Sequence, residues 1–189
     1  ITCLQGSGSL AIELMAYNFL NGNVLIVNTG YYSDRIKNIC NNLKKIKRIN
    51  QTFLVDWKKI DNYKLDKKIN WIIACPTETS IGLHVPIKNI KKLSLKFKSK
   101  LMLDATASFP LDKGHHLADV LSYSSCKGLC GLTGASFINY NSKPRYYKNS
   151  FYLNLLNHEN KKMTGPYHTI LSLKNIVSNY SLFKKSIQI

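Results

Sequence analysis

The chain has 189 residues, of which 44% are hydrophobic and 11% aromatic, and its 27 basic and 10 acidic side chains give a formal charge of +17. A chain of this length can bury one sizeable core, so we expect a single soluble globular domain and exclude a disordered or multi-domain chain. No apolar run reaches the roughly 18 residues that a membrane-spanning helix needs, so no membrane partner is expected.

The high positive charge raises the question of nucleic-acid binding. Most of the basic residues are lysines spread over predicted helix faces among many Ile and Asn residues, rather than arginines gathered with aromatic side chains. A general compositional bias explains this pattern more simply than a nucleic-acid partner does. The five cysteines are scattered and contain no Cys-x-x-Cys pair, which favours a reducing, cytoplasmic setting.

Strand-like and helix-like patterns alternate along the chain. We predict strands at 1–4, 24–27, 51–55, 71–75, 101–103, 120–123 and 135–139. We predict helices at 8–20 and 33–45, a helix opened by Pro86, and a further helix beyond Pro166. This alternation predicts an α/β fold with a mostly parallel sheet flanked by helices. Because both ends stop inside a regular pattern, we expect the natural protein to extend further in each direction.

Charged side chains are nearly absent from four long stretches. Residues 1–33 contain only Glu13, 69–87 only Glu78, 101–111 only Asp104, and 120–142 only Lys127. Since burying an unpaired charge is costly, these stretches are predicted to be interior. Glu78, Asp104 and Lys127 fall at or just after predicted strand ends, where open α/β sheets place their chemistry.

Residues 5–9 and Asp104 suggest how an anionic heteroaromatic ligand could be held. The glycines of residues 5–9, directly before a helix, would let backbone N–H groups approach a phosphate, although Ser7 could equally be an ordinary N-cap. Asp104 could pair with a protonated pyridine nitrogen, or it could simply cap the turn after its strand.

The other candidates complete such a site. Desolvation of Lys127 would favour its neutral amine, which could then attack a carbonyl carbon, while a solvated turn lysine is the alternative. Glu78 could be buried and hydrogen-bonded, leaving Thr79 or Ser80 to offer a hydroxyl to a cofactor phenolate. The ring of Tyr32, after Tyr31, could stack on a heteroaromatic ligand. The histidines show no metal-binding spacing, so no metal site is predicted.

Taken in order, these motifs resemble the class V, fold-type-I aminotransferases, which depend on pyridoxal 5'-phosphate. The segments that carry the resemblance are residues 4–9, 28–35, 78–87, 104–109 and 124–134. Within that family they look most like the 2-aminoethylphosphonate–pyruvate transaminases. The resemblance implies that residues 1–189 form the cofactor-binding large domain of a homodimer, without the family's N-terminal segment and small C-terminal domain.

The resemblance also implies roles for residues around the cofactor ring. Lys127 would hold the cofactor as a Schiff base and later move a proton between substrate and cofactor carbons. Tyr32 would stack on the ring, Thr79 would lie near its phenolic oxygen, and Thr106 would line it. Asp104 would hold the pyridine nitrogen and keep the ring electron-withdrawing.

The phosphate end is implied to involve two further segments. Ser7, Gly8 and Ser9 would bind the phosphate of the cofactor. Cys126 stands beside the lysine where relatives usually have Asn or Gln, a departure that bears on cofactor affinity. Thr164 lies in a stretch that resembles the one donating a threonine to the neighbouring subunit's phosphate site.

The implied reaction transfers the amino group of 2-aminoethylphosphonate to pyruvate, giving phosphonoacetaldehyde and alanine. An alanine–glyoxylate or serine–pyruvate transaminase is a sibling alternative. A cysteine desulfurase is disfavoured because its characteristic histidines would fall at Tyr32 and Cys126. A non-catalytic relative and a basic nucleic-acid-binding module are the alternatives from other classes.

Overall fold

A seven-stranded mixed sheet forms the centre of the protein in a computed structural model that describes residues 1–145, 150–160 and 163–187. The strand order is β1-β9-β8-β7-β4-β2-β3. The strands are β1 (Thr2–Gln5), β2 (Gly22–Asn28), β3 (Ile49–Asp56), β4 (Trp71–Ala74), β7 (Lys100–Asp104), β8 (Val120–Ser124) and β9 (Ala135–Tyr140). A separate hairpin pairs β5 (Thr77–Glu78) with β6 (Leu83–His84).

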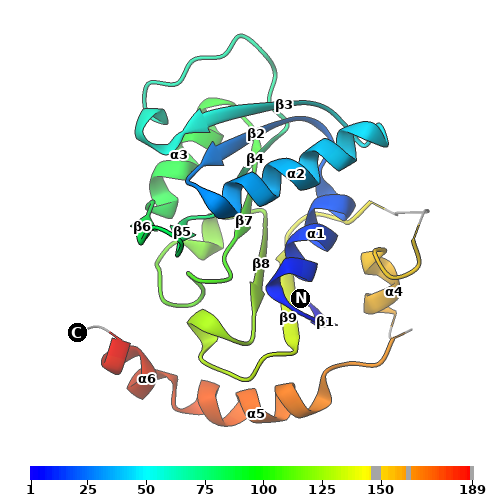
Figure 1. Ribbon diagram of the computed structural model, residues 1–189, viewed down its shortest axis with the longest axis vertical. Helices are drawn as coiled ribbons and strands as arrows, with labels where there is room; N and C mark the ends of the chain where they lie inside the picture. The colour runs from blue at the N-terminus through cyan, green and yellow to red at the C-terminus, as the bar shows by residue number, and fades with distance from the viewer. Residues whose placement is uncertain (146–149, 161–162, 188–189) are drawn as a thin grey trace.

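Helices cover both faces of the sheet, and two more extend past one of its ends (Figure 1). The helices are α1 (Gly8–Phe19), α2 (Tyr31–Lys45), α3 (Ile87–Lys96), α4 (Leu155–Glu159), α5 (Tyr167–Ser178) and α6 (Tyr180–Ile187). Buried side chains of α1, α2 and α4 pack on one face, and those of α3 pack on the other together with Leu173 of α5. Within the described residues, no helix is long and apolar enough to cross a membrane.

The strand β4 shows why the central stretches lack charge. Trp71 and Ile73 point into the core beneath α1 and α2, while Ile72 and Ala74 point into the core beneath α3. Successive side chains of a strand face opposite sides, so a strand covered by helices on both faces must be apolar throughout. The predicted α/β fold, with its mostly parallel sheet, is therefore confirmed.

Some elements were not predicted from the sequence. The hairpin β5–β6 and the helices α4 and α6 are short or lie in segments without a clear period. The edge of the sheet is also antiparallel, because β9 runs opposite to both β8 and β1.

This topology brings five chain segments to one edge of the sheet. The strands β2, β4, β7 and β8 are parallel, and β1 shares their direction because both β1 and β8 are antiparallel to β9. The carboxyl ends of β1, β2, β4, β7 and β8 therefore lie on the same side, which is where open α/β sheets bind ligands.

Candidate active site

A cavity of about 190 Å³ opens at the carboxyl edge of the sheet. Its walls come from the loops after β1, β2, β4, β7 and β8. Eight of the ten predicted site positions line it, namely Ser7, Gly8, Ser9, Tyr32, Asp104, Thr106, Cys126 and Lys127. Segments far apart in the sequence thus converge on a space that suits a compact ligand.

The loop after β1 places the start of α1 at the cavity. The Gly6 N–H donates to the Gly134 carbonyl at 2.9 Å, and the Ser7 carbonyl accepts from the N–H groups of Leu10 and Ala11. Ser7 occupies the N-cap position, yet among the described residues its side chain makes no capping hydrogen bond. The ordinary N-cap alternative therefore does not account for its hydroxyl, which remains at the helix start, where free N–H groups and the helix dipole attract anions.

The side chain of Glu78 binds the backbone at the start of α2. Its side chain is fully buried. The carboxylate accepts hydrogen bonds from the Tyr32 N–H at 2.8 Å, the Ser80 N–H at 3.2 Å and the Ser80 hydroxyl at 2.6 Å. Glu78 is thus buried and hydrogen-bonded, as predicted, and it engages the hydroxyl of Ser80. Thr79 keeps its own hydroxyl close to the site, donating to Tyr32 Oη at 3.5 Å.

Tyr32 lies beside Lys127. Lys127 Nζ donates to Tyr32 Oη at 3.3 Å and lies 5.0 Å from the centroid of its ring. The hydrogen bond from Thr79 and the one from Lys127 lower the pKa of the Tyr32 phenol, since both stabilise the phenolate. Tyr31 is 69% exposed and touches Tyr32 only edge-on, so Tyr32 presents its ring to the cavity.

Asp104 also lines the cavity, and its side chain is only 2% exposed. Its Oδ1 accepts hydrogen bonds from the Thr106 N–H at 3.2 Å and the Thr106 hydroxyl at 2.7 Å. Its Oδ2 pairs with Arg35 Nη2 at 3.1 Å. Asp104 therefore does cap the turn after its strand, and it also lines the cavity, while its pairing with a ring nitrogen stays a prediction.

Arg35 was not singled out from the sequence, although it lines the cavity. It lies three residues after Tyr32, which places both side chains on the same face of α2. That helical spacing is the signal that could have identified it.

Lys127 differs from the sequence-based expectation because its side chain is exposed. The desolvation argument for this lysine was therefore wrong. A run without charge was taken as interior, whereas the segment around Lys127 mixes buried and exposed residues: Gly128 and Leu129 are buried, while Leu132 is 62% exposed.

The loop around Lys127 is tightly built. Lys127 adopts a left-handed backbone conformation with φ 57°, which is uncommon for a residue with a side chain. Gly128 packs so closely on the Phe109 carbonyl that a Cβ would overlap with it. The buried Ser125 hydroxyl donates to the carbonyls of Leu132 at 2.6 Å and Ala135 at 3.0 Å, which fixes the loop onto β9.

Two implied positions remain to be placed. Cys126 lines the cavity, with its Sγ 3.3 Å from the Ser124 hydroxyl. Thr164 is exposed and lies outside the cavity, in a segment that follows residues 161–162, which are not described. Its implied contribution to a neighbouring subunit stays a prediction.

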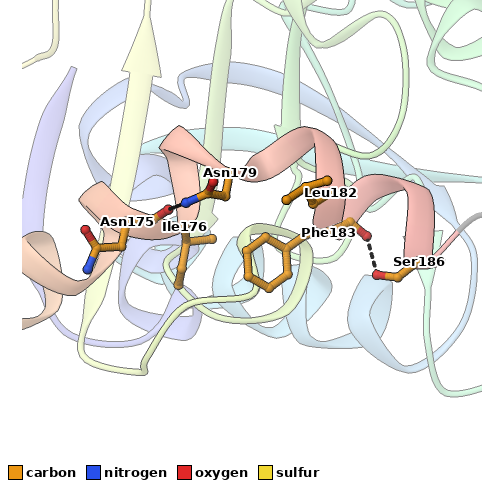
Figure 2. A pocket seen from close by; sticks show the side chains of 6 residues that line it. All are labelled: Asn175, Ile176, Asn179, Leu182, Phe183 and Ser186. Atoms are coloured by element: carbon orange, nitrogen blue, oxygen red, sulfur yellow. Dashed lines mark hydrogen bonds between the residues drawn. The ribbon is translucent and has the colours of Figure 1, made fainter.

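A second, larger cavity of about 460 Å³ lies between α5 and α6 (Figure 2). Its lining consists of apolar and uncharged polar side chains, namely Asn175, Ile176, Asn179, Leu182, Phe183 and Ser186. None of these six side chains is ionisable near neutral pH, so this cavity lacks the carboxylate and amine groups that line the smaller one.

The smaller cavity has the donor set that pyridoxal phosphate requires. Serine hydroxyls at a helix start suit the phosphate, the ring of Tyr32 suits stacking, and a buried carboxylate at Asp104 suits a ring nitrogen. Lys127 lines the same space, and its amine suits reaction with an aldehyde. The residues present therefore fit this cofactor.

Comparison with known proteins points the same way. No protein-family model matches the chain. A bifunctional phosphonoacetaldehyde hydrolase/aminoethylphosphonate transaminase from Clostridioides difficile (strain 630) is 32% identical over 145 residues, which are 71% of this chain and 23% of that protein. A 2-aminoethylphosphonate–pyruvate transaminase from Pseudomonas fluorescens is 28% identical over 146 residues, covering 71% of this chain and 39% of that protein. The chain belongs to the class V, fold-type-I aminotransferase family.

Solved structures of aminotransferases share the fold. The pyridoxamine–pyruvate aminotransferase from Mesorhizobium loti superposes with a TM-score of 0.82 at 18% identity, covering 98% of this chain and 54% of that one. The alanine–glyoxylate aminotransferase from Nostoc sp. superposes with a TM-score of 0.71 at 16% identity, covering 93% and 52%. Members of this family use pyridoxal phosphate. The chain spans about a quarter and about two fifths of the length of the two curated relatives, and about half of the length of the two solved structures.

Proposed function

We propose that this chain forms the cofactor-binding part of a pyridoxal-phosphate-dependent transaminase that moves the amino group of 2-aminoethylphosphonate to pyruvate, giving phosphonoacetaldehyde and alanine. One observation carries the transaminase chemistry: Ser7, Ser9, Tyr32, Asp104 and Lys127 line a single cavity although they come from four different segments. The phosphonate donor is supported by the aminoethylphosphonate transaminase activity of the two relatives from Clostridioides difficile and Pseudomonas fluorescens.

Each side chain has a defined task in this proposal. The hydroxyls of Ser7 and Ser9 and the start of α1 bind the phosphate, and Tyr32 supports the ring. Asp104 accepts a hydrogen bond from the ring nitrogen. When bound, the cofactor supplies an electron-withdrawing ring that stabilises negative charge on the substrate carbon.

Lys127 acts first as a nucleophile and then as a proton carrier. Its Nζ would hold the cofactor through a covalent link, and once freed by an amino donor the same amine would be the group that moves a proton at the substrate carbon. The hydrogen bond to Tyr32 Oη at 3.3 Å holds this amine beside the ring of Tyr32. Thr79 donates to the same phenolic oxygen and so limits the motion of the pair.

Borohydride trapping tests the lysine. Incubation with pyridoxal phosphate followed by borohydride should fix the cofactor to Lys127, as read by peptide mapping, and Lys127→Ala should lose this label. Lys98→Ala is a matched control, because Lys98 is also exposed and left-handed, with φ 49°, but lies outside the cavity. A Lys127→Ala protein that labels as strongly as the wild type would overturn the assignment.

A donor panel tests the substrate. Alanine formation from pyruvate should be fastest with 2-aminoethylphosphonate when compared with carboxylate donors such as serine. Faster transfer from serine, or from alanine to glyoxylate, would instead favour the serine–pyruvate or alanine–glyoxylate alternative. Tight duplex DNA binding with a steep salt dependence, and no cofactor labelling, would favour the nucleic-acid module.

A homodimer also belongs to the proposal. Thr164 is exposed and lies outside the cavity, so its side chain is free to contribute to a neighbouring subunit's phosphate site. Sedimentation should give a dimer whose cofactor affinity falls in Thr164→Ala. A monomer that binds the cofactor with the same affinity in both forms would contradict this part.

A further inference from the structure

Arg35 connects the two ends of the cavity. Its Nη1 donates to Ser9 Oγ at 2.9 Å, and its Nη2 donates to Asp104 Oδ2 at 3.1 Å. The guanidinium carbon also lies 4.9 Å from the centroid of the Tyr32 ring. One side chain of α2 thus contacts the residue proposed for the phosphate, the residue proposed for the ring nitrogen and the stacking residue.

The chemistry of the guanidinium suits this arrangement. Its planar fork presents two N–H groups in a fixed geometry, so Ser9 and Asp104 are held at a set separation although they belong to α1 and β7. A lysine ammonium in the same place is a flexible point charge without such a fork. The Arg35 side chain is 29% exposed and its Asp104 partner 2%, so solvent screens this pair less than a surface ion pair.

We propose that Arg35 is a positioning residue that sets the separation of Ser9 and Asp104 and places a permanent positive charge next to the cofactor. This inference rests on the proposed function. Both Asp104 oxygens are already engaged, Oδ1 by Thr106 and Oδ2 by Arg35, so the carboxylate is held in one orientation before any ligand arrives. Loss of Arg35 would release one oxygen of Asp104 and the Ser9 hydroxyl together.

The charge of Arg35 predicts a second effect. The ionisable side chains that line the cavity are Tyr32, Arg35, Cys75, Asp104, Cys126 and Lys127, and Glu78 lies behind Tyr32. Arg35 Cζ and Lys127 Nζ lie 4.9 Å and 5.0 Å from the centroid of the same Tyr32 ring, so the Arg35 cation would disfavour a proton on the Lys127 nitrogen once that nitrogen holds the cofactor. Removing the charge of Arg35 should therefore raise the pH midpoint of the colour change of the bound cofactor by about one unit.

Two substitutions separate position from charge. In Arg35→Gln, the cofactor dissociation constant should rise about tenfold, and the pH midpoint should rise. In Arg35→Lys, the midpoint should stay near the wild-type value while the affinity still falls, because one ammonium does not replace the fork. Lys37→Gln, which removes an exposed charge from the same helix, should change neither quantity.

A double-mutant cycle tests whether Arg35 acts through Asp104. In an Asp104→Asn background, Arg35→Gln should weaken cofactor binding by clearly less than tenfold, since the pair is already broken. A fully additive effect, or an Arg35→Gln protein with wild-type affinity and midpoint, would overturn the inference.

If circular dichroism shows that Arg35→Gln is unfolded, the Arg35→Lys variant decides the test, and wild-type cofactor affinity in that variant overturns the inference. A wild-type protein that binds no cofactor refutes the proposed function itself, whereas normal binding with unaffected Arg35 variants refutes only this inference.

Discussion

Replacing Glu78 with alanine should destabilise the protein at the point where α2 meets the cavity. The Glu78 side chain is fully buried, and it accepts hydrogen bonds from two backbone N–H groups and one hydroxyl. One of these N–H groups belongs to Tyr32, in the first turn of α2. Glu78→Ala leaves the half-buried Tyr32 N–H without its charged partner, whereas the N–H and hydroxyl of Ser80 are exposed and can bond to water.

The cost can be worked from these contacts. A hydrogen bond to a charged group contributes about 1.5–3 kcal/mol, and a negative charge at a helix start contributes about 0.3–1 kcal/mol. Because Ser80 is exposed, its N–H and hydroxyl can bond to water instead, so mainly the Tyr32 N–H counts. We therefore expect Glu78→Ala to lower the free energy of unfolding by about 3 kcal/mol, a large share of the ~5–15 kcal/mol that stabilises a typical domain. Glu78→Gln keeps the shape and one acceptor oxygen, so about half that loss is expected.

Urea unfolding measures this effect. The fluorescence of Trp71, which is 3% exposed in the core, reports the transition. Glu159→Ala is the control, because Glu159 is exposed at the end of α4 and should cost less than about 1 kcal/mol. Cofactor affinity should fall in Glu78→Ala as well, since Tyr32 loses its backbone anchor. A Glu78→Ala protein within about 0.5 kcal/mol of the wild type would refute the reasoning.

Two further predictions concern ionisation. Because hydrogen bonds from Thr79 and Lys127 lower the pKa of the Tyr32 phenol, alkaline titration should show a tyrosine that ionises early, and Tyr32→Phe should remove it. This phenolate contribution to stability grows as the pH rises through the lowered pKa and is absent below it. Burial raises the pKa of the Cys40 thiol to about 12, so alkylation near neutral pH should reach it only after unfolding. Cys126, which is partly exposed, should react in the folded protein and be protected by pyridoxal phosphate; equal rates for both thiols would contradict this.

Much of the fold was predictable because buried strands leave a strong compositional trace. A strand such as β4, covered on both faces, can hold no charge, and this trace located the central strands and the positions of Glu78 and Asp104. The two-residue strands of the β5–β6 hairpin are too short to show a period, so sequence reasoning missed them.

The site was predictable in part for a different reason. Ser7 and Tyr32 sit next to strand ends, so topology alone brings them together. The pairing of Arg35 with Asp104 joins residues 69 positions apart through side chains, which no local pattern reports. The exposure of Lys127 was missed because an uncharged run looks the same whether it forms the core or the rim of a cavity.

The exposure of Lys127 affects which lysine the aldehyde of the cofactor would react with. The chain has 27 basic residues, most of them lysines, and an aldehyde reacts with any neutral amine that it meets. Since Lys127 is solvated like many of the others, chemical reactivity alone does not single it out. In the proposed enzyme, discrimination would come from reversible docking of phosphate and ring, which raises the local concentration of aldehyde at one amine. Modification should therefore be confined to Lys127 at low cofactor concentration and spread over the surface only when docking is saturated.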